Sequence, residues 1–365
     1  MATEYNSNNG FQLISKYRSA IMGFSALWIL FFHTWVPLID NSPNVFVYCL
    51  YFSERVLQRI GFCGVDIFLL LSGLGLTYAI RKGSLLQFYF RRFKRILPVF
   101  FIVAIVRCFV EHWSLTTFLG NISGFNFYVH DIYSFLWFVT AIVTLYLLFP
   151  LYYKLFCKVK NKYLVTGIAI LVWFIASVLV RDIMRLDLFA FTNRIPIFLV
   201  GIHFGYITQN NKQLVFKKWI YAVLTVVFAA GVVLAFFYNF RGFSIILPQG
   251  NCFLPNFLIA ISLPFLQAKL LDILDRKAPK AGKIFVAFFA FFGAFSFELY
   301  CVQDWLMDAI PYLVYFEWPG ILINVTSFLI ISAISWVLSV IIKYLWEFID
   351  KISKHKNAKT ENISK

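Results

Sequence analysis

Long apolar runs separated by short polar and basic segments make up most of the chain. Each run extends over about 20 residues, which is the length an α-helix needs to cross the hydrocarbon core of a bilayer. The pattern predicts ten spans, at residues 19–39, 59–80, 96–112, 134–156, 163–181, 189–208, 217–239, 246–268, 284–306 and 317–342. The expected fold is therefore all-α: a polytopic integral membrane protein.

Two of the ten runs are weaker than the others. The run at 96–112 is short and contains Arg107, and the run at 246–268 begins in the stretch LPQGNCFLP, which is rich in residues that break helices. We count both as spans because the charge pattern of the loops requires them.

Lys and Arg residues are distributed unevenly between alternate loops. With both termini on the cytoplasmic side, inner segments hold 26 of the 33 basic residues. The others lie on the outer side or in the outer half of a span: Arg55, Arg59, Arg107, Arg181, Arg185, Arg194 and Arg241. Because cytoplasmic loops of membrane proteins carry an excess of Lys and Arg, this asymmetry supports ten spans with both termini cytoplasmic.

The composition agrees with a membrane protein of one domain. Hydrophobic residues make up 61% of the chain and charged residues only 14%, against about 25% in soluble domains. We expect a cytoplasmic segment at 1–18, a ten-helix membrane domain at 19–342 and a basic cytoplasmic tail at 343–365.

The net charge of +16 has the same origin as the loop asymmetry. These charges lie between spans, where they orient the chain and contact anionic membrane lipids, so nucleic-acid binding is a poor interpretation. The six cysteines are scattered without the spacing of a metal site, and we predict no metal.

Two ionisable side chains are expected at the same depth in consecutive spans. Counting the helical rise from Asp40 and from Arg59 places both His33 and Asp66 about 10 Å below the outer surface. A carboxylate beside an imidazole is a recurring general-base arrangement, whereas a structural pair between helices is the alternative.

Further charged side chains are expected in the outer half of the helix bundle. Arg107, Arg194 and Glu298 reach this zone by the same count of helical rise. Charges in hydrocarbon need partners or water, so together with His33 and Asp66 they indicate a polar cavity. Structural ion pairs between helices are the alternative for the two arginines.

A basic segment lies on the opposite, cytoplasmic side. The stretch RKGSLLQFYFRRFKRILP at 81–98 carries six Lys and Arg residues interleaved with aromatics. It is either an anchor that follows the positive-inside rule or a clamp for the phosphates of an anionic cofactor, for which Arg side chains are well suited.

These stretches resemble a known family. GFCGVDIFLLLSGLGLTY at 61–78, followed by FYFRRFKRILPVF at 88–100, is similar to the signature of acyltransferase family 3, which comprises integral-membrane acyltransferases. Many members O-acetylate bacterial surface polysaccharides. Further similar segments follow in the family's order, at 17–33, 134–153, 193–206 and 295–306.

Two positions depart from the family pattern. Many members carry Arg or Lys about ten residues before the histidine of the first span, where this chain has Met22. Either Arg18, about one turn earlier, substitutes from a shifted position or that role is absent. The late element ends in Gln303, where many members have His.

The resemblance implies an acyl-CoA donor, usually acetyl-CoA, that enters from the cytoplasm, and a glycan acceptor on the outer side. It implies that His33 is a general base or a transient acyl carrier and that Asp66 orients it, with Glu298 as a third catalytic candidate. The expected location is the bacterial inner membrane.

The resemblance also suggests binding residues. The candidates for the acyl-CoA site are Arg91, Arg92, Arg95, Ser72 and Gly73. The candidates for substrate binding are Arg18, Arg107, Arg194 and Trp137. Helix packing is the alternative for Ser72, Gly73 and Trp137.

A proton-coupled secondary transporter of a small polar solute is the main competing function, because intramembrane His, Asp, Glu and Arg are typical of one. Internal repeats and paired broken helices, which mark alternating access, are not evident in the sequence. A non-catalytic scaffold would explain neither His33 nor the inner arginines. The sequence does not specify the acceptor, the acyl length or an oligomeric state.

Overall fold

The computed structural model describes residues 9–40, 43–129, 135–184, 188–210, 215–241 and 253–363, and the side chains of 239–241 and 353–363 are excluded from this description. Helices and short connections account for all of these residues, with no strand among them, which confirms the all-α prediction. The first half contains α1 (Gly10–Thr34), α2 (Val45–Arg59), η1 (Ile60–Cys63), α3 (Gly64–Ala79), α4 (Leu85–Val110), α5 (Leu115–Ile122), α6 (Phe125–Val129), α7 (Trp137–Lys158) and α8 (Lys162–Asp182). The second half contains α9 (Phe189–Thr192), α10 (Ile195–Asn210), α11 (Lys218–Arg241), α12 (Phe253–Lys277), α13 (Pro279–Ala294), α14 (Ser296–Leu306), η2 (Met307–Ala309), α15 (Ile310–Tyr315) and α16 (Gly320–Ile363).

Six helices of the described chain are long and apolar enough to cross a membrane, and a bent pair would make a seventh. Three of the ten predicted spans fall outside this set, at 19–39, 96–112 and 189–208. The last corresponds mainly to α10, whose 16 residues are fewer than the about 20 that a bilayer requires. The start of the predicted span 246–268 lies outside the described residues.

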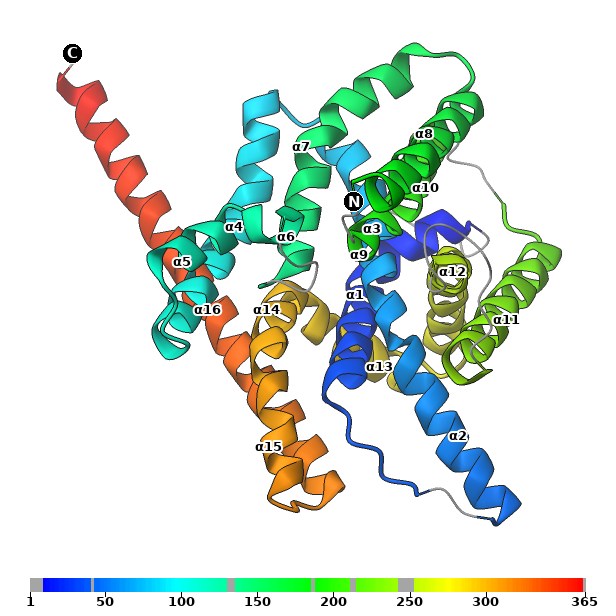
Figure 1. Cartoon of the computed structure of the whole chain (residues 1–365). Helices are drawn as coiled ribbons and strands as arrows, with labels where there is room; N and C mark the ends of the chain where they lie inside the picture. The colour runs from blue at the N-terminus through cyan, green and yellow to red at the C-terminus, as the bar shows by residue number, and fades with distance from the viewer. Residues whose placement is uncertain are drawn as a thin grey trace.

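Helix α1 lies at the centre of the bundle (Figure 1). It packs against α3, α12, α13 and α14, while α10 packs along α3. Helix α16 passes the side formed by α14 and α4, and its last turns extend beyond the bundle (Figure 1). The residues of α1 and α3 are thus enclosed by neighbouring helices, which suits them to line an internal site.

The helices α1 and α13 approach each other closely where both carry glycine. A Cβ atom at Gly293 would overlap the carbonyl oxygen of Ser19, and one at Gly23 would overlap the carbonyl oxygen of Phe289. Small residues allow this close backbone contact in membrane helix pairs. The contact fixes α13 beside α1 and therefore positions the helix that follows α13.

That following helix begins at a sharp break. The helices α13 and α14 are bent by 67° at Phe295, so the predicted span 284–306 is two helices rather than one. The first turn of α14 consequently starts inside the bundle, and the side chains of Ser296 and Glu298 lie buried there.

Most of the segment between the first two predicted spans forms a helix, α2, from Val45 to Arg59, whereas the apolar pattern ends the first span at 39 and begins the second at 59. The Asn44 side chain accepts hydrogen bonds from the backbone N–H groups of Phe46 and Val47 and so caps α2. The helix continues through η1 into α3, giving a helical segment from Val45 to Ala79.

The expected segment boundaries at 18/19 and 342/343 both fall inside helices. Helix α1 already begins at Gly10, where the Asn9 side chain accepts hydrogen bonds from the N–H groups of Phe11 and Gln12. Helix α16 continues through the basic tail to Ile363. The helical geometry is therefore continuous across both expected boundaries.

The glycine contact between α1 and α13 predicts a stability effect. Gly293→Leu should lower the thermal stability of the purified protein, because the added side chain must displace the backbone of α1 at a cost of about 1–3 kcal/mol or more. The measurement is the midpoint temperature of aggregation in detergent. Gly167→Leu is the matched control, since the structure has no atom within 4 Å of a Cβ there. Equal midpoints for the two variants would contradict the close contact.

Candidate functional site

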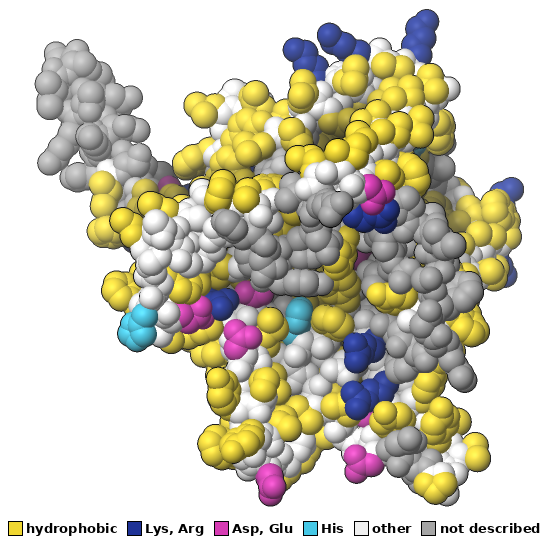
Figure 2. Space-filling model, in the orientation of Figure 1, with side chains coloured by type: hydrophobic (Ala, Val, Ile, Leu, Met, Phe, Trp, Pro, Cys, Tyr) yellow, Lys and Arg dark blue, Asp and Glu magenta, His cyan; other side chains and the backbone are white. Residues whose placement is uncertain are grey.

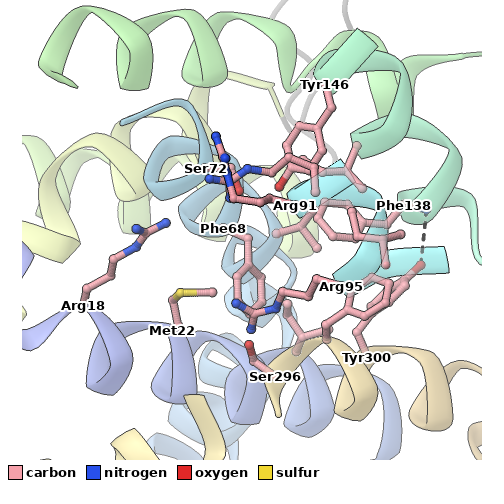
Figure 3. Close-up of a pocket in the computed structure, with 16 residues that line it drawn as sticks. Arg18, Met22, Phe68, Ser72, Arg91, Arg95, Phe138, Tyr146, Ser296 and Tyr300 are labelled. Atoms are coloured by element: carbon pink, nitrogen blue, oxygen red, sulfur yellow. Dashed lines mark hydrogen bonds between the residues drawn. The ribbon is translucent and has the colours of Figure 1, made fainter. Parts of the chain in front are cut away.

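A cavity opens between α1, α3, α4, α7 and α14 (Figure 3). It contains about 810 Å³ of empty space, part of it open to solvent. Its lining residues are Arg18, Met22, Ile29, Val65, Phe68, Ser72, Arg91, Arg92, Arg95, Ile96, Phe138, Ile142, Tyr146, Ser296, Phe297 and Tyr300. We call this space the arginine cavity.

Four arginines line the cavity, and the helical repeat explains why they converge. Arg91, Arg92 and Arg95 lie in the early turns of α4, where residues four positions apart share one face. The capping box between Ser84 and Gln87 fixes where this helix begins. Arg18 faces the same space from α1, and Figure 3 shows the Arg95 side chain reaching from α4 toward α14.

The arginines of the cavity have little compensation from acidic groups. None of the sixteen lining residues is acidic. Arg18 donates a hydrogen bond to the carbonyl oxygen of Leu71 at 3.1 Å, but its Nε and the Nε of Arg92 are buried without a hydrogen-bond partner. Arg91 donates to the carbonyl oxygens of Ala79, the last residue of α3, and of Lys82 in the connection between α3 and α4. The arrangement suits an anionic ligand, because guanidinium groups bind phosphate and carboxylate well.

Away from the arginines, the cavity follows α1 toward the opposite end of the bundle. Arg18, Met22 and Ile29 line it from one face of α1, and this face extends over about 16 Å. His33 lies on the same face of α1, one further turn and about 6 Å beyond Ile29. The cavity thus leads from the arginines toward His33.

His33 occupies the last turn of α1 and is half-buried. Its ring packs edge-on against Phe32, with ring centroids 4.8 Å apart. The cavity-lining Ile29 lies one turn before His33 on α1, and Asp66 directly follows the cavity-lining Val65 on α3. No hydrogen bond or ion pair joins His33 to Asp66 among the described residues, so the expectation that Asp66 orients His33 stays a prediction.

Asp66 instead pairs with Arg194. The Arg194 Nε lies 3.6 Å from the Asp66 Oδ2, and both side chains are almost fully buried. The guanidinium also donates to the carbonyl oxygen of Ala190 and lies over the rings of Phe62 and Trp137, at 4.3 and 5.1 Å from their centroids. The pair joins the start of α3 to the start of α10, so the candidates Arg194 and Trp137 lie in one buried cluster with Asp66.

Arg107 belongs to a separate network of ion pairs. Its guanidinium lies 2.6 Å from Glu111, 3.3 Å from Asp304 and 3.8 Å from Asp308. It also lies over the rings of Trp113 and Phe135. The network joins the end of α4 to the end of α14 and neutralises the charge of Arg107. This is the arrangement expected if Arg107 forms structural ion pairs between helices.

Glu298 lies in the first turn of α14, between the cavity-lining Ser296 and Tyr300. It is 7% exposed, and its Oε2 is buried without a hydrogen-bond partner. Arg95 is the basic side chain that acts on it electrostatically. The break at Phe295 therefore brings a buried carboxylate beside the wall of the arginine cavity.

Ser72 and Gly73 are neighbours on α3 but face different surroundings. Ser72 lines the arginine cavity. Gly73 faces α10 instead, where a Cβ atom would overlap the carbonyl oxygen of Phe198. Gly73 therefore has the environment expected for helix packing, whereas Ser72 borders the cavity.

Sequence reasoning missed some of the side chains at this site. Phe138 and Tyr300 line the cavity together, and the Tyr300 hydroxyl accepts a hydrogen bond from the Phe138 backbone N–H at 3.3 Å. Tyr146 also lines it. Helical spacing connects Phe138, Ile142 and Tyr146 as one face of α7, a signal that the sequence contained. Groups of three or more metal-ligating side chains are absent from the described part of the chain.

Comparison with known proteins supports one assignment. The family described as the acyltransferase domain matches residues 20–344. No curated protein and no solved structure shows significant similarity to the chain. The match covers most of the chain and includes α3, α4, α7 and α14 in full and α1 from residue 20 onward, whereas Arg18 lies just before it. This coverage favours an acyltransferase over the alternative of a transporter. The chain belongs to the membrane acyltransferase family that this domain defines.

Proposed function

We propose that the protein transfers an acyl group, preferentially acetyl, from acyl-CoA to a hydroxyl group of a cell-surface carbohydrate. The observation that carries this proposal is the arginine cavity, which begins at four guanidinium groups and leads to within one helical turn of His33. Family membership supports acyl transfer as the reaction. The acyl-CoA donor and the glycan acceptor are inferred from the chemistry of the two ends.

The arginine end fits the anionic part of acyl-CoA. Three phosphate groups need several cationic donors, and Arg18, Arg92 and Arg95 present them without an acidic lining residue. The Ser72 hydroxyl and the apolar Phe68 line the path onward from them along α3. An extended pantetheine arm in this passage would deliver the thioester toward His33.

His33 has the chemistry for the transfer step. Its imidazole would take the proton of the acceptor hydroxyl as the oxygen forms a bond to the acyl carbon. The bond between carbon and sulfur then breaks, and the proton passes to the leaving thiolate. The buried Asp66–Arg194 pair would position the start of α3 beside this reaction, and Glu298 would supply a second carboxylate at the cavity.

The proposal includes a location and an orientation. The basic residues of the α3–α4 connection and of α4 would face the cytoplasm, where acyl-CoA is made, and His33 would lie toward the outer side. In a bacterial inner membrane, with ten spans and cytoplasmic termini, the protein would join a cytoplasmic donor to an external acceptor.

If the arginines form the donor site, removing one of them should lower the affinity for acetyl-CoA. Arg92→Ala and Arg95→Ala should each raise the Kd for acetyl-CoA roughly tenfold or more, because each removes a charge-assisted contact of about 1.5–3 kcal/mol. Titration of the purified protein with acetyl-CoA measures this.

Lys94→Ala is the matched control for this titration. Lys94 lies between the two arginines on α4 but pairs with Asp350 at 3.5 Å and with the Trp346 ring, outside the cavity. An unchanged Kd in both arginine variants, or an equal loss in Lys94→Ala, would show that the basic run only anchors the helix.

The catalytic role of His33 predicts a loss of rate. His33→Ala should lower acetyl transfer about 10²–10⁴-fold per folded molecule while acetyl-CoA still binds, because a general base is removed and the donor site remains. His112→Asn is the control, since that histidine is exposed and has a positive φ that Asn tolerates. Near-normal specific activity of His33→Ala would refute this role.

The orientation predicts opposite accessibility of two loops. In a cysteine-free background, the thiol of Pro43→Cys should react with a membrane-impermeant maleimide on intact cells. The thiol of Lys82→Cys should react only after permeabilisation, because the two positions lie at opposite ends of α3 and its helical extension. Labelling of both from the same side would be incompatible with the proposed orientation.

A further inference from the structure

A second, smaller cavity lies beside His33, away from the arginine cavity. Phe32, Arg55, Gln58 and Arg59 line it, and it contains about 380 Å³ of empty space, part of it open to solvent. Phe32 is the neighbour of His33, and their rings are in edge contact. His33 therefore lies between two cavities, of which one follows the α1 face before it and the other adjoins it from α2.

The position of this second cavity is fixed by contacts between α1 and α2. Gln58 donates hydrogen bonds to the backbone carbonyl oxygens of Phe32 and Trp35, at 3.5 and 2.8 Å. The Trp28 indole donates to the carbonyl oxygen of Leu57 at 2.9 Å. These bonds hold the last two turns of α2 beside the last turns of α1, so the side chains of α2 stay in reach of a molecule bound next to His33.

Two arginines of this cavity have no acidic partner. Neither Arg55 nor Arg59 forms an ion pair among the described residues, and the Arg55 Nε is buried without a hydrogen-bond partner. The acidic neighbour Glu54 is occupied elsewhere, since its carboxylate accepts hydrogen bonds from the Trp35 indole and from the N–H of Leu38. The cavity is therefore positively charged.

The two arginines are arranged to act together. They are four residues apart on α2, so their side chains start from the same face of the helix about 6 Å apart. Arg55 also lies over the ring of Tyr51, at 5.5 Å from its centroid, which restricts its guanidinium. Figure 2 shows basic side chains, a histidine and several acidic side chains on the lower half of the molecular surface. Two such guanidinium groups bind a carboxylate or a phosphate far better than a neutral hydroxyl.

We propose that the cavity of Phe32, Arg55, Gln58 and Arg59 binds the acceptor, and that the acceptor is an anionic glycan whose carboxylate or phosphate contacts Arg55 and Arg59. The proposal rests on the proposed function, because it places the hydroxyl to be acylated beside His33. Specificity for a charged sugar then depends on α2, which lies between the first two predicted spans.

The test compares three glycosides that differ only at C6: p-nitrophenyl β-glucoside, p-nitrophenyl β-glucuronide and p-nitrophenyl β-glucoside 6-phosphate. Binding to the protein in phosphatidylcholine nanodiscs is measured by saturation-transfer NMR. We expect the glucuronide, the 6-phosphate or both to bind at least about tenfold more tightly than the glucoside. The anionic ligand that binds more tightly then identifies the preferred anionic group. Equal binding of all three overturns the proposal.

Variants connect the preference to the two arginines. In Arg55→Gln/Arg59→Gln the anionic preference should disappear while acetyl-CoA affinity, which reports on folding and on the donor site, stays unchanged. Arg55→Lys/Arg59→Lys should recover part of the preference. Arg181→Gln is the matched control, because that arginine pairs with Asp182 on the separate helix α8 and should leave the preference intact. A preference that survives in the double Gln variant overturns the proposal.

A last experiment distinguishes a glycan from a lipid headgroup as the source of the anionic group. The titrations are repeated in nanodiscs that contain phosphatidylglycerol. A preference that persists there supports the acceptor site, whereas its loss shows that the arginines bind lipid phosphate and overturns the proposal. Binding does not require turnover, so an anionic preference without any acetyl transfer would refute the proposed function alone.

Discussion

A charge buried among apolar helices needs a partner, and this constraint organises the bundle. Two clusters meet it internally: Asp66 with Arg194, and Arg107 with Asp304 and its acidic neighbours. Each joins helices that are distant in sequence. The arginine cavity leaves four guanidinium groups without an acidic lining residue. The paired arginines therefore join helices, whereas the four arginines of the cavity are the ones that we propose to bind a ligand.

Helix geometry turns the unpaired arginines into part of a passage. The α1 face that begins with Arg18 continues through Met22 and Ile29 to His33, so one helix connects the proposed donor site to the proposed general base. The glycine contact places α13 beside α1, and the break at Phe295 then turns α14 into the bundle. Ser296 therefore lines the passage, and Glu298 lies buried next to it. Arg18 lies one turn before Met22 and lines the same cavity, which supports the alternative that Arg18 substitutes for the basic residue of the family pattern.

The sequence predicted the features that depend on local periodicity. The all-helical fold and the convergence of Arg91, Arg92 and Arg95 follow from apolar length and from the spacing of residues along one helix. The partner of Asp66 could not be predicted, because depth along a helix does not determine the direction in which a side chain points, and Arg194 comes from a distant helix. The break at Phe295 was also missed, since the apolar pattern continues across it without a proline.

The central claim is that the acyl end of acyl-CoA reaches position 33 while its phosphates lie at the inner arginines. The most direct measurement uses bromoacetyl-CoA and His33→Cys in a background without other cysteines, with alkylation located by peptide mass spectrometry. The account predicts that the thiol introduced at position 33 displaces bromide, that free CoA protects it, and that Arg92→Ala slows the reaction at least about tenfold at subsaturating reagent. A protein that binds CoA but shows no CoA-protected alkylation at position 33 would contradict the account.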